Sequence, residues 1–137
     1  MRLLRPTDRD LLSSWIELEP EHRGFLPEFW YERNRVSLVI EDRNGPVMFV
    51  KLSPEPPSMR LHIQFSPDPS RVAKAMLKHF AEVKKFITNI GAEYIVFDTK
   101  NPKLAEFCSK AFGFIRVGDT EDYIVPLKGD SNGQPIT

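Results

Sequence analysis

The sequence predicts a single α/β domain built on a mixed sheet. Segments of alternating hydrophobicity, typical of strands, are interleaved with segments whose apolar residues recur every three or four positions, typical of amphipathic helices. A strand, a long helix and another strand follow one another across residues 59–97, an order that implies a right-handed crossover and parallel pairing of the two strands. The predicted domain spans residues 1–127, and the polar, glycine-containing residues 128–137 are expected to be disordered.

The chain is predicted to begin with a short strand and a short helix. The strand comprises residues 3–4 and is ended by Pro6. Asp8 or Asp10 can then cap a helix that runs to about Leu18. The buried face of this helix is expected to comprise Leu11, Trp15 and Leu18.

A second short helix is expected over residues 28–33, opened by Pro27 after a break at residues 19–24. The region is rich in aromatic residues that look exposed, namely Phe25, Phe29, Trp30 and Tyr31. They could line a ligand pocket or form a lid on the core.

A hairpin is predicted from two apolar runs, residues 36–41 and 47–52, which flank Asn44-Gly45, the strongest short-range hairpin signal. The proline-rich residues 53–58 are expected to form a loop. The alternation over residues 59–65 predicts a half-buried strand. Its apolar face comprises Leu61, Ile63 and Phe65, and its other face Arg60, His62 and Gln64.

The longest predicted helix covers residues 70–90 and stops at Gly91. Its apolar face comprises Val72, Met76, Phe80, Val83, Ile87 and Ile90. A buried strand follows at residues 94–97.

The C-terminal part is predicted to hold one helix and a closing pair of strands. Asn101 is the helix cap, Pro102 the first helical residue and Gly113 the stop. The strands are expected at residues 115–117 and 122–127.

Composition excludes several classes of function. Lysine plus arginine equal aspartate plus glutamate, 19 against 19, so nucleic acid and anionic membrane are not expected partners. The one cysteine, Cys108, cannot form an intramolecular disulfide. The apolar runs are too short to span a bilayer, and the arginines and proline among the first six residues argue against a signal peptide. The expected location is the cytoplasm, and no metal site is expected.

The segment Asn101–Phe114, NPKLAEFCSKAFGF, resembles the late-helix signature of the GCN5-related N-acetyltransferase (GNAT) family. The shared pattern is an asparagine, an alanine inside the helix, an aromatic-bearing turn, and Gly-Phe entering the next strand. Residues 5–11, RPTDRDL, resemble the family's first strand and its turn into the first helix. With the element order, the resemblance covers about residues 2–127. It implies a GNAT-like fold whose central parallel strands splay apart, and acetyl transfer from acetyl-CoA to an amine.

The resemblance also implies a cofactor site at the start of the long helix. In the family, backbone amides there hold the pyrophosphate of acetyl-CoA, in a loop that usually reads Arg/Gln-x-x-Gly-x-Gly/Ala, because a helix N-terminus favours anions. The positions that correspond to this site are Phe65, Ser70, Arg71, Val72, Ala73 and Lys74.

This loop departs from the family pattern in having no glycine and two prolines. Asp68-Pro69 forms a strong helix cap, whose carboxylate would occupy the amides and repel a pyrophosphate. Binding of acetyl-CoA is therefore expected to be weak or absent, although Ser70, Arg71 and Lys74 could supply donors. The alternative interpretation of Arg71, Lys74 and Lys78 is a solvated helix face.

The expected catalytic residues are His62 and Ser109. Many family members carry a tyrosine four residues before the glycine of Gly-Phe, which protonates the departing thiolate; here that position is Ser109, a much weaker acid than tyrosine with its pKa of roughly 10. The general base could be His62, Glu41 or Asp98, and His62 could equally be an ordinary strand histidine on the solvent side. Cys108 is expected to be a core thiol rather than a nucleophile.

Three functions remain open. The first is an N-acetyltransferase acting on an amine of a small molecule or peptide. The second is a non-catalytic relative that binds a protein partner, resembling GNAT-like virion-associated proteins of some tailed phages. The third is an acyltransferase that uses another donor such as an aminoacyl-tRNA, which the neutral charge disfavours.

Overall fold

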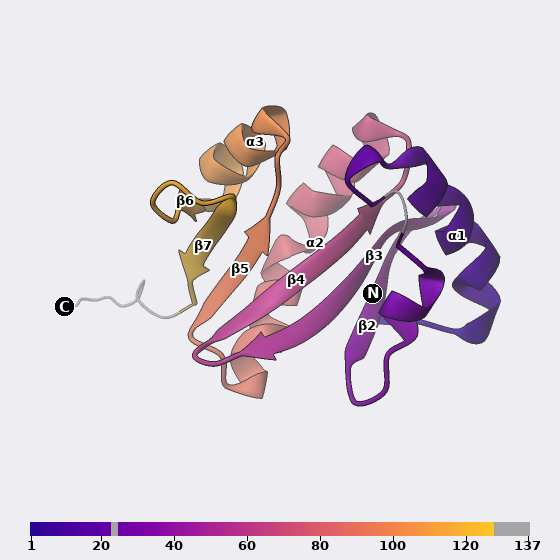
Figure 1. Ribbon diagram of the computed structural model, residues 1–137, viewed down its shortest axis with the longest axis horizontal. Coiled ribbons are helices and arrows are strands. Elements are labelled where there is room, and N and C mark those ends of the chain that lie inside the picture. Colours follow the sequence, from indigo (N-terminus) through magenta and orange to yellow (C-terminus); the bar gives the residue numbers. More distant parts are fainter. Residues whose placement is uncertain (23–24, 128–137) are drawn as a thin grey trace. The chain divides into compact units, whose positions relative to one another are not determined.

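The computed structural model describes residues 1–22 and 25–127 (Figure 1). Seven strands form a mixed sheet in the order β1-β2-β3-β4-β5-β7-β6. The chain divides into two compact units, residues 1–53 with 62–80, and residues 54–61 with the chain from Ala81 onward. A single domain over residues 1–127 stays a prediction, and the predicted disordered tail lies outside the described residues.

The first unit contains the N-terminal strands and the shorter helices. Its elements are β1 (Arg2–Leu3), α1 (Arg9–Leu18), β2 (Val36–Asp42), most of β3 (Gly45–Glu55), the end of β4 (Ser58–Phe65), the start of α2 (Pro69–Ile90), and the 3₁₀ helices η1 (Pro6–Asp8), η2 (Pro20–His22) and η3 (Pro27–Tyr31). β2 pairs antiparallel with both β1 and β3. The predicted hairpin is confirmed: Asp42 pairs with Gly45, whose φ of 106° few residues other than glycine adopt.

The core of the first unit lies between α1, η3 and one face of the β2–β3 hairpin. It comprises Leu12, Trp15, Ile16, Trp30, Val39 and Phe49. The expected buried face of α1 is confirmed at Trp15, which is buried, and wrong at Leu11 and Leu18, which are exposed. Residues 11, 15 and 18 and residues 12, 15 and 16 both fit a helical period, and the set that is buried is the one that packs with Val39 and Phe49. The expected exposure of Trp30 is also wrong, since this side chain is 1% exposed.

Residues 53–58, expected to be a loop, instead extend β3 and β4 into a hairpin with a tight turn at Pro56-Pro57. The pairing of β2 with β3 ends at Leu52. Pro54, which has no backbone N–H, therefore interrupts no hydrogen bond to β2 and is tolerated in the strand. β4 also departs from simple alternation, because Gln64 is 0% exposed although it lies on the predicted polar face.

The second unit contains β5 (Tyr94–Asp98), α3 (Pro102–Phe112), β6 (Ile115–Arg116) and β7 (Asp122–Pro126), together with the β3–β4 turn and the end of α2. β7 lies between β5 and β6 and pairs antiparallel with both (Figure 1). β4 and β5 pair in parallel over Ser58–Arg60 and Tyr94–Val96, as predicted.

Helix α3 begins and ends as the sequence predicts. The Asn101 side chain accepts hydrogen bonds from the amides of Lys103 and Leu104, and Gly113 closes the helix in the left-handed conformation at φ 81°. Phe114 then enters the core, 4% exposed, and packs edge-on against Phe97 at a centroid distance of 4.9 Å.

Candidate functional site

The start of α2 is capped by its own chain. Oδ1 of Asp68 accepts hydrogen bonds from the amides of Ser70, at 3.1 Å, and Arg71, at 3.3 Å. The carbonyl of Asp68 accepts from the amide of Val72, and Pro69 has no N–H to offer. The predicted cap is therefore confirmed, and the first-turn amides that a bound anion would use already have acceptors.

Arg71, expected to be a cofactor ligand or part of a solvated face, is instead bound to the β2–β3 hairpin. Its guanidinium donates to both carboxylate oxygens of Asp42, at 2.8 and 2.7 Å, and to the carbonyls of Gly45 and Pro46. Hydrogen bonding from Arg71 lowers the pKa of Asp42 to about 2. Arg71 thus holds the first turn of α2 against the hairpin.

The remaining predicted cofactor residues differ in exposure. Ser70 and Lys74 are exposed, Phe65, Val72 and Ala73 are half-buried, and the carbonyl of Phe65 accepts from the Gln64 amide at 3.2 Å. A pyrophosphate could bind here only by displacing Asp68 from two amides, and Arg71 is bonded to Asp42, so the arrangement fits weak binding at most.

His62, the predicted base, lies on β4 beside η3. Its half-buried ring packs edge-on against Phe29, with 4.9 Å between centroids. The same phenyl ring carries the ammonium of Lys51 over its face, 3.6 Å from the centroid. Nζ of Lys51 donates to Oε1 of Glu32 at 3.0 Å. A histidine and a buried lysine therefore contact one aromatic ring, and a glutamate binds the lysine.

A second polar pair lies on the same strand. Gln64 Oε1 is 2.7 Å from His22 Nδ1, and Gln64 Nε2 donates to the carbonyl of Trp15 at 3.4 Å. The sequence analysis assigns no site role to Lys51 or Gln64. The sequence signal for Lys51 is a charged residue in the middle of the apolar run at residues 47–52.

The two alternative bases are bound to arginines. Glu41 lies 3.2 Å from Nε of Arg2, and Asp98 accepts from Nη1 of Arg60 at 3.1 Å. Both carboxylates are therefore already engaged by guanidinium groups.

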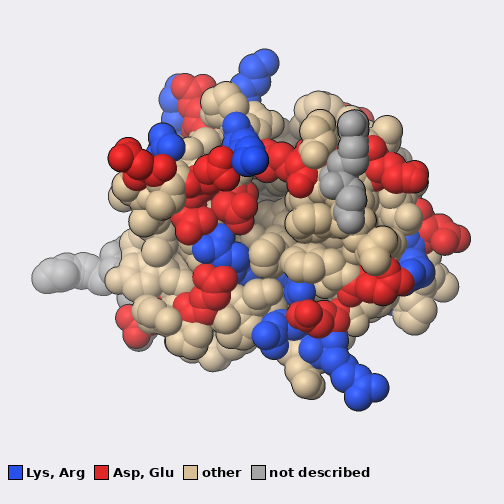
Figure 2. Space-filling model, viewed as in Figure 1, with Lys and Arg blue, Asp and Glu red and all other residues tan. Residues whose placement is uncertain are grey.

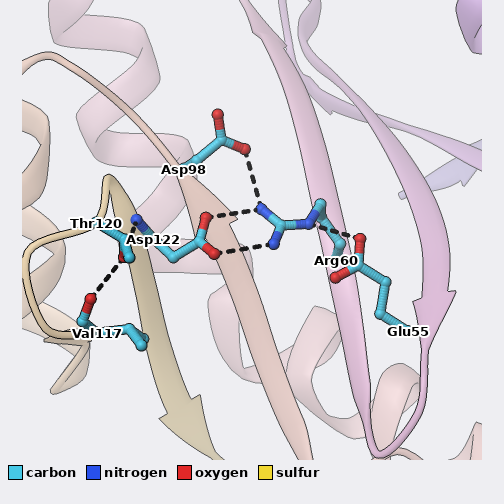
Figure 3. A network of polar contacts seen from close by, with 6 residues as sticks. All are labelled: Glu55, Arg60, Asp98, Val117, Thr120 and Asp122. Carbon is cyan, nitrogen blue, oxygen red and sulfur yellow. Dashed lines mark hydrogen bonds and ion pairs between the residues drawn. The ribbon is translucent and has the colours of Figure 1, made fainter.

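Arg60 is the centre of a carboxylate cluster in the second unit (Figure 3). It donates to Glu55 through Nε at 2.7 Å and to Asp122 through both Nη atoms at 3.0 and 3.1 Å, in addition to Asp98. Hydrogen bonding from Arg60 lowers the pKa of Asp122. Acidic side chains gather around basic ones on the face over β5 and β7 (Figure 2), and the cluster ties the β3–β4 turn to both strands.

Ser109 and Cys108 are adjacent on α3 but differ in environment. Ser109 is exposed, whereas Cys108 is 3% exposed, and burial raises the pKa of its thiol to about 12. Cys108 is therefore the core thiol that was expected, not a nucleophile.

Among residues 1–22 and 25–127, no group of three or more His, Cys, Asp or Glu could hold a metal ion. No helix in that part of the chain has the length and apolarity needed to cross a membrane.

Solved structures match this arrangement over nearly the whole chain. The aminoglycoside 6'-N-acetyltransferase from Enterococcus faecium superposes with a TM-score of 0.71 at 16% identity, covering 97% of each chain. An aminoglycoside 6'-N-acetyltransferase complexed with coenzyme A gives 0.69 at 15% identity, over 98% of this chain and 99% of that one. A candidate acetyltransferase of the GNAT family from Desulfovibrio desulfuricans gives 0.69 at 17%, over 92% and 97%.

The chain has the GNAT fold. The predicted fold class is thereby confirmed, including the mixed sheet with its central parallel pair. No protein-family model matches the sequence, and comparison with curated proteins gives no significant match. At these identities the GNAT fold is what the likeness shows, and the site residues stay predictions.

Proposed function

We propose that this chain is an N-acetyltransferase that transfers an acetyl group from acetyl-CoA to an amine and binds this donor weakly. The observation that carries the proposal is the near-complete superposition on N-acetyltransferases, one of them in complex with coenzyme A. Acetyl-CoA, when bound, supplies the activated acetyl group.

Within this proposal His62 is the general base. Its imidazole can take the proton that an attacking amine loses, and a histidine has a pKa near neutrality suited to that task. Phe29 orients the ring through the edge-on contact at 4.9 Å, and Lys51 holds Phe29 from its face. Ser109 lies where many GNAT proteins carry a tyrosine acid, so the leaving group lacks an efficient proton donor, and turnover is expected to be slow.

The second candidate function is a non-catalytic GNAT-fold protein that binds a protein partner. It is favoured by the capped start of α2, where Asp68 already accepts from the amides of Ser70 and Arg71. A chain that never binds a pyrophosphate gains helix stability from such a cap.

One experiment separates the two functions. Release of free coenzyme A from acetyl-CoA is measured with the purified protein across a panel of amines, beside a variant with His62→Ala. Turnover that His62→Ala reduces by about 10²–10⁴, the range of general acid–base effects, supports the enzyme. Leu77→Ala, which changes an exposed residue of α2, is the matched control and should leave the rate unchanged. Absence of turnover with every amine, together with a stoichiometric partner, supports the non-catalytic protein.

A further inference from the structure

Lys51 is a buried charged residue in the first unit. It pairs with Ser37 across β2 and β3, and Ser37 Oγ donates to the carbonyl of Trp30 at 2.6 Å, so both side chains lie on the face of the sheet that η3 covers. The Lys51 side chain is 3% exposed. Lysines are rarely buried this far without partners that compensate their charge and hydrogen bonds.

Two residues that pack against Phe29, Lys51 and Trp30, have N–H groups without a hydrogen-bond acceptor in the described part of the chain. An ammonium group has three N–H donors, and Glu32 Oε1 is the one acceptor of Lys51 among residues 1–22 and 25–127. Trp30 packs edge-on against Phe29 at 5.0 Å and is 1% exposed. Its indole Nε1–H has no hydrogen-bond partner in the described part of the chain. A buried donor without an acceptor calls for an explanation, and a ligand oxygen is one.

Glu32 is placed so that another carboxylate can replace it. Its side chain is 55% exposed and reaches Lys51 through one oxygen. The same oxygen lies 3.9 Å from Nε of Arg35, which offers a second cationic partner. Glu32 can therefore move to Arg35 without losing its ion pair, and the exchange of one carboxylate for another at Lys51 leaves the net charge around Phe29 unchanged.

We propose that Lys51 anchors the carboxylate of a small ligand in place of Glu32, and that the Trp30 indole, which packs on the same phenyl ring, reports its binding. The proposal deepens the acetyltransferase function and rests on it in one respect, that the ligand is also the amine acceptor. His62 packs against the same phenyl ring, so the anchor and the candidate base belong to one site. The predicted acceptor class is an amine that carries a carboxylate, such as an amino acid.

The test uses three probes that separate the two ends of such a ligand: propionate, propylamine and β-alanine, each compared with sodium chloride at equal ionic strength. The readouts are the melting temperature and the NMR resonance of the Trp30 indole N–H. Propionate and β-alanine should saturably raise the melting temperature of the wild-type protein and shift the indole resonance, whereas propylamine should do neither. Lys51→Met should abolish both responses.

Glu32→Ala provides a second test of the anchor in case the Lys51→Met variant does not fold. This variant leaves Lys51 without its carboxylate, so it should melt below wild type in chloride and recover with propionate. Glu28→Ala, which removes another half-exposed glutamate of the η3 region, is the matched control and should show no recovery. A wild-type protein that responds to propionate no more than to chloride would overturn the anchor.

Binding and turnover separate this inference from the proposed function. If propionate binds through Lys51 but β-alanine and every other amine remain unacetylated, the anchor stands and the acetyltransferase function fails. If amines without a carboxylate are acetylated while propionate leaves the indole resonance unmoved, the enzyme stands and the anchor is wrong.

Discussion

Arg71 and Asp42 form a two-point ion pair, with distances of 2.8 and 2.7 Å, that fixes the first turn of α2 to the β2–β3 hairpin. Asp42 has a pKa lowered to about 2, so the pair contributes stability that is fully present above the unfolded pKa of about 3.9 and is lost as the pH falls through about 2. Arg71→Met should therefore melt below wild type at pH 6, and the difference should narrow between pH 5 and pH 2.

Thermal melts across that pH range, with Arg43→Met as the control, provide the measurement. Arg43 is an exposed arginine of the same hairpin turn, and its loss should leave the melting temperature nearly unchanged. A gap between Arg71→Met and wild type that stays constant down to pH 2 would show that Arg71 acts through packing and its bonds to the carbonyls of Gly45 and Pro46, not through Asp42.

Asp68 controls access to the amides at the start of α2. Asp68→Gly should bind coenzyme A about tenfold more tightly than wild type, which corresponds to about 1.4 kcal/mol, because the change frees two amides and removes a negative charge. Asp68→Asn is the matched variant, since it keeps the cap and removes the charge. Calorimetry should rank the affinities as glycine above asparagine above aspartate. A wild-type dissociation constant in the low micromolar range would contradict this account.

Arg60 holds three carboxylates together in the second unit. Arg60→Met should destabilise the protein by about 2 kcal/mol, because it removes charge-assisted hydrogen bonds and leaves Glu55, Asp98 and Asp122 to repel one another. Asp98→Asn should cost no more than about 0.5 kcal/mol, since the Asp98 side chain is 51% exposed. Urea unfolding of both variants tests this ranking, and equal losses would show that the cluster has no central residue.

Phe114 contributes to the core directly after α3. Phe114→Ala should lower the free energy of unfolding by about 3–5 kcal/mol, because the ring is 4% exposed and packs on Phe97. Ile115→Ala, one residue later and 65% exposed, is the control and should be nearly neutral. Melting of Phe114→Ala within a couple of degrees of wild type would show that the core lies elsewhere.

Features with a local cause could be predicted from the sequence. The Asn101 cap, the Gly113 stop, the Asn44-Gly45 turn and the Asp68 cap each depend on backbone groups within a few residues, and all four are present. The order of strands and helices follows from the same local patterns, and it led to the GNAT fold.

Features that depend on distant residues could not be predicted. Arg71 and Asp42 are 29 positions apart, and Arg60 and Asp122 are 62 apart, so no spacing rule relates them. Sequence analysis therefore predicted that Arg71 is a cofactor ligand or a solvated residue, whereas in the structure Arg71 binds Asp42 of the hairpin. The role of Lys51 could not be predicted for the same reason, because its partner Glu32 is 19 positions earlier in the sequence, before β2.

The last prediction concerns Ser109, and it depends on the proposed acetyltransferase function. A serine hydroxyl, unlike a tyrosine with its pKa of roughly 10, is too weak an acid to protonate a departing thiolate efficiently. Ser109 is exposed on α3, so a larger side chain can be placed there without a clash in the core. Ser109→Tyr should therefore raise the turnover number, by up to about 10² at the low end of general-acid effects, and leave the Michaelis constant for the amine unchanged. Lys110→Tyr is the matched control, because it adds the same phenol at the next exposed position of the helix, facing a different direction. Equal rates for both variants would mean that the thiolate does not leave near Ser109, whereas a gain confined to Ser109→Tyr would place the reaction beside this turn of α3.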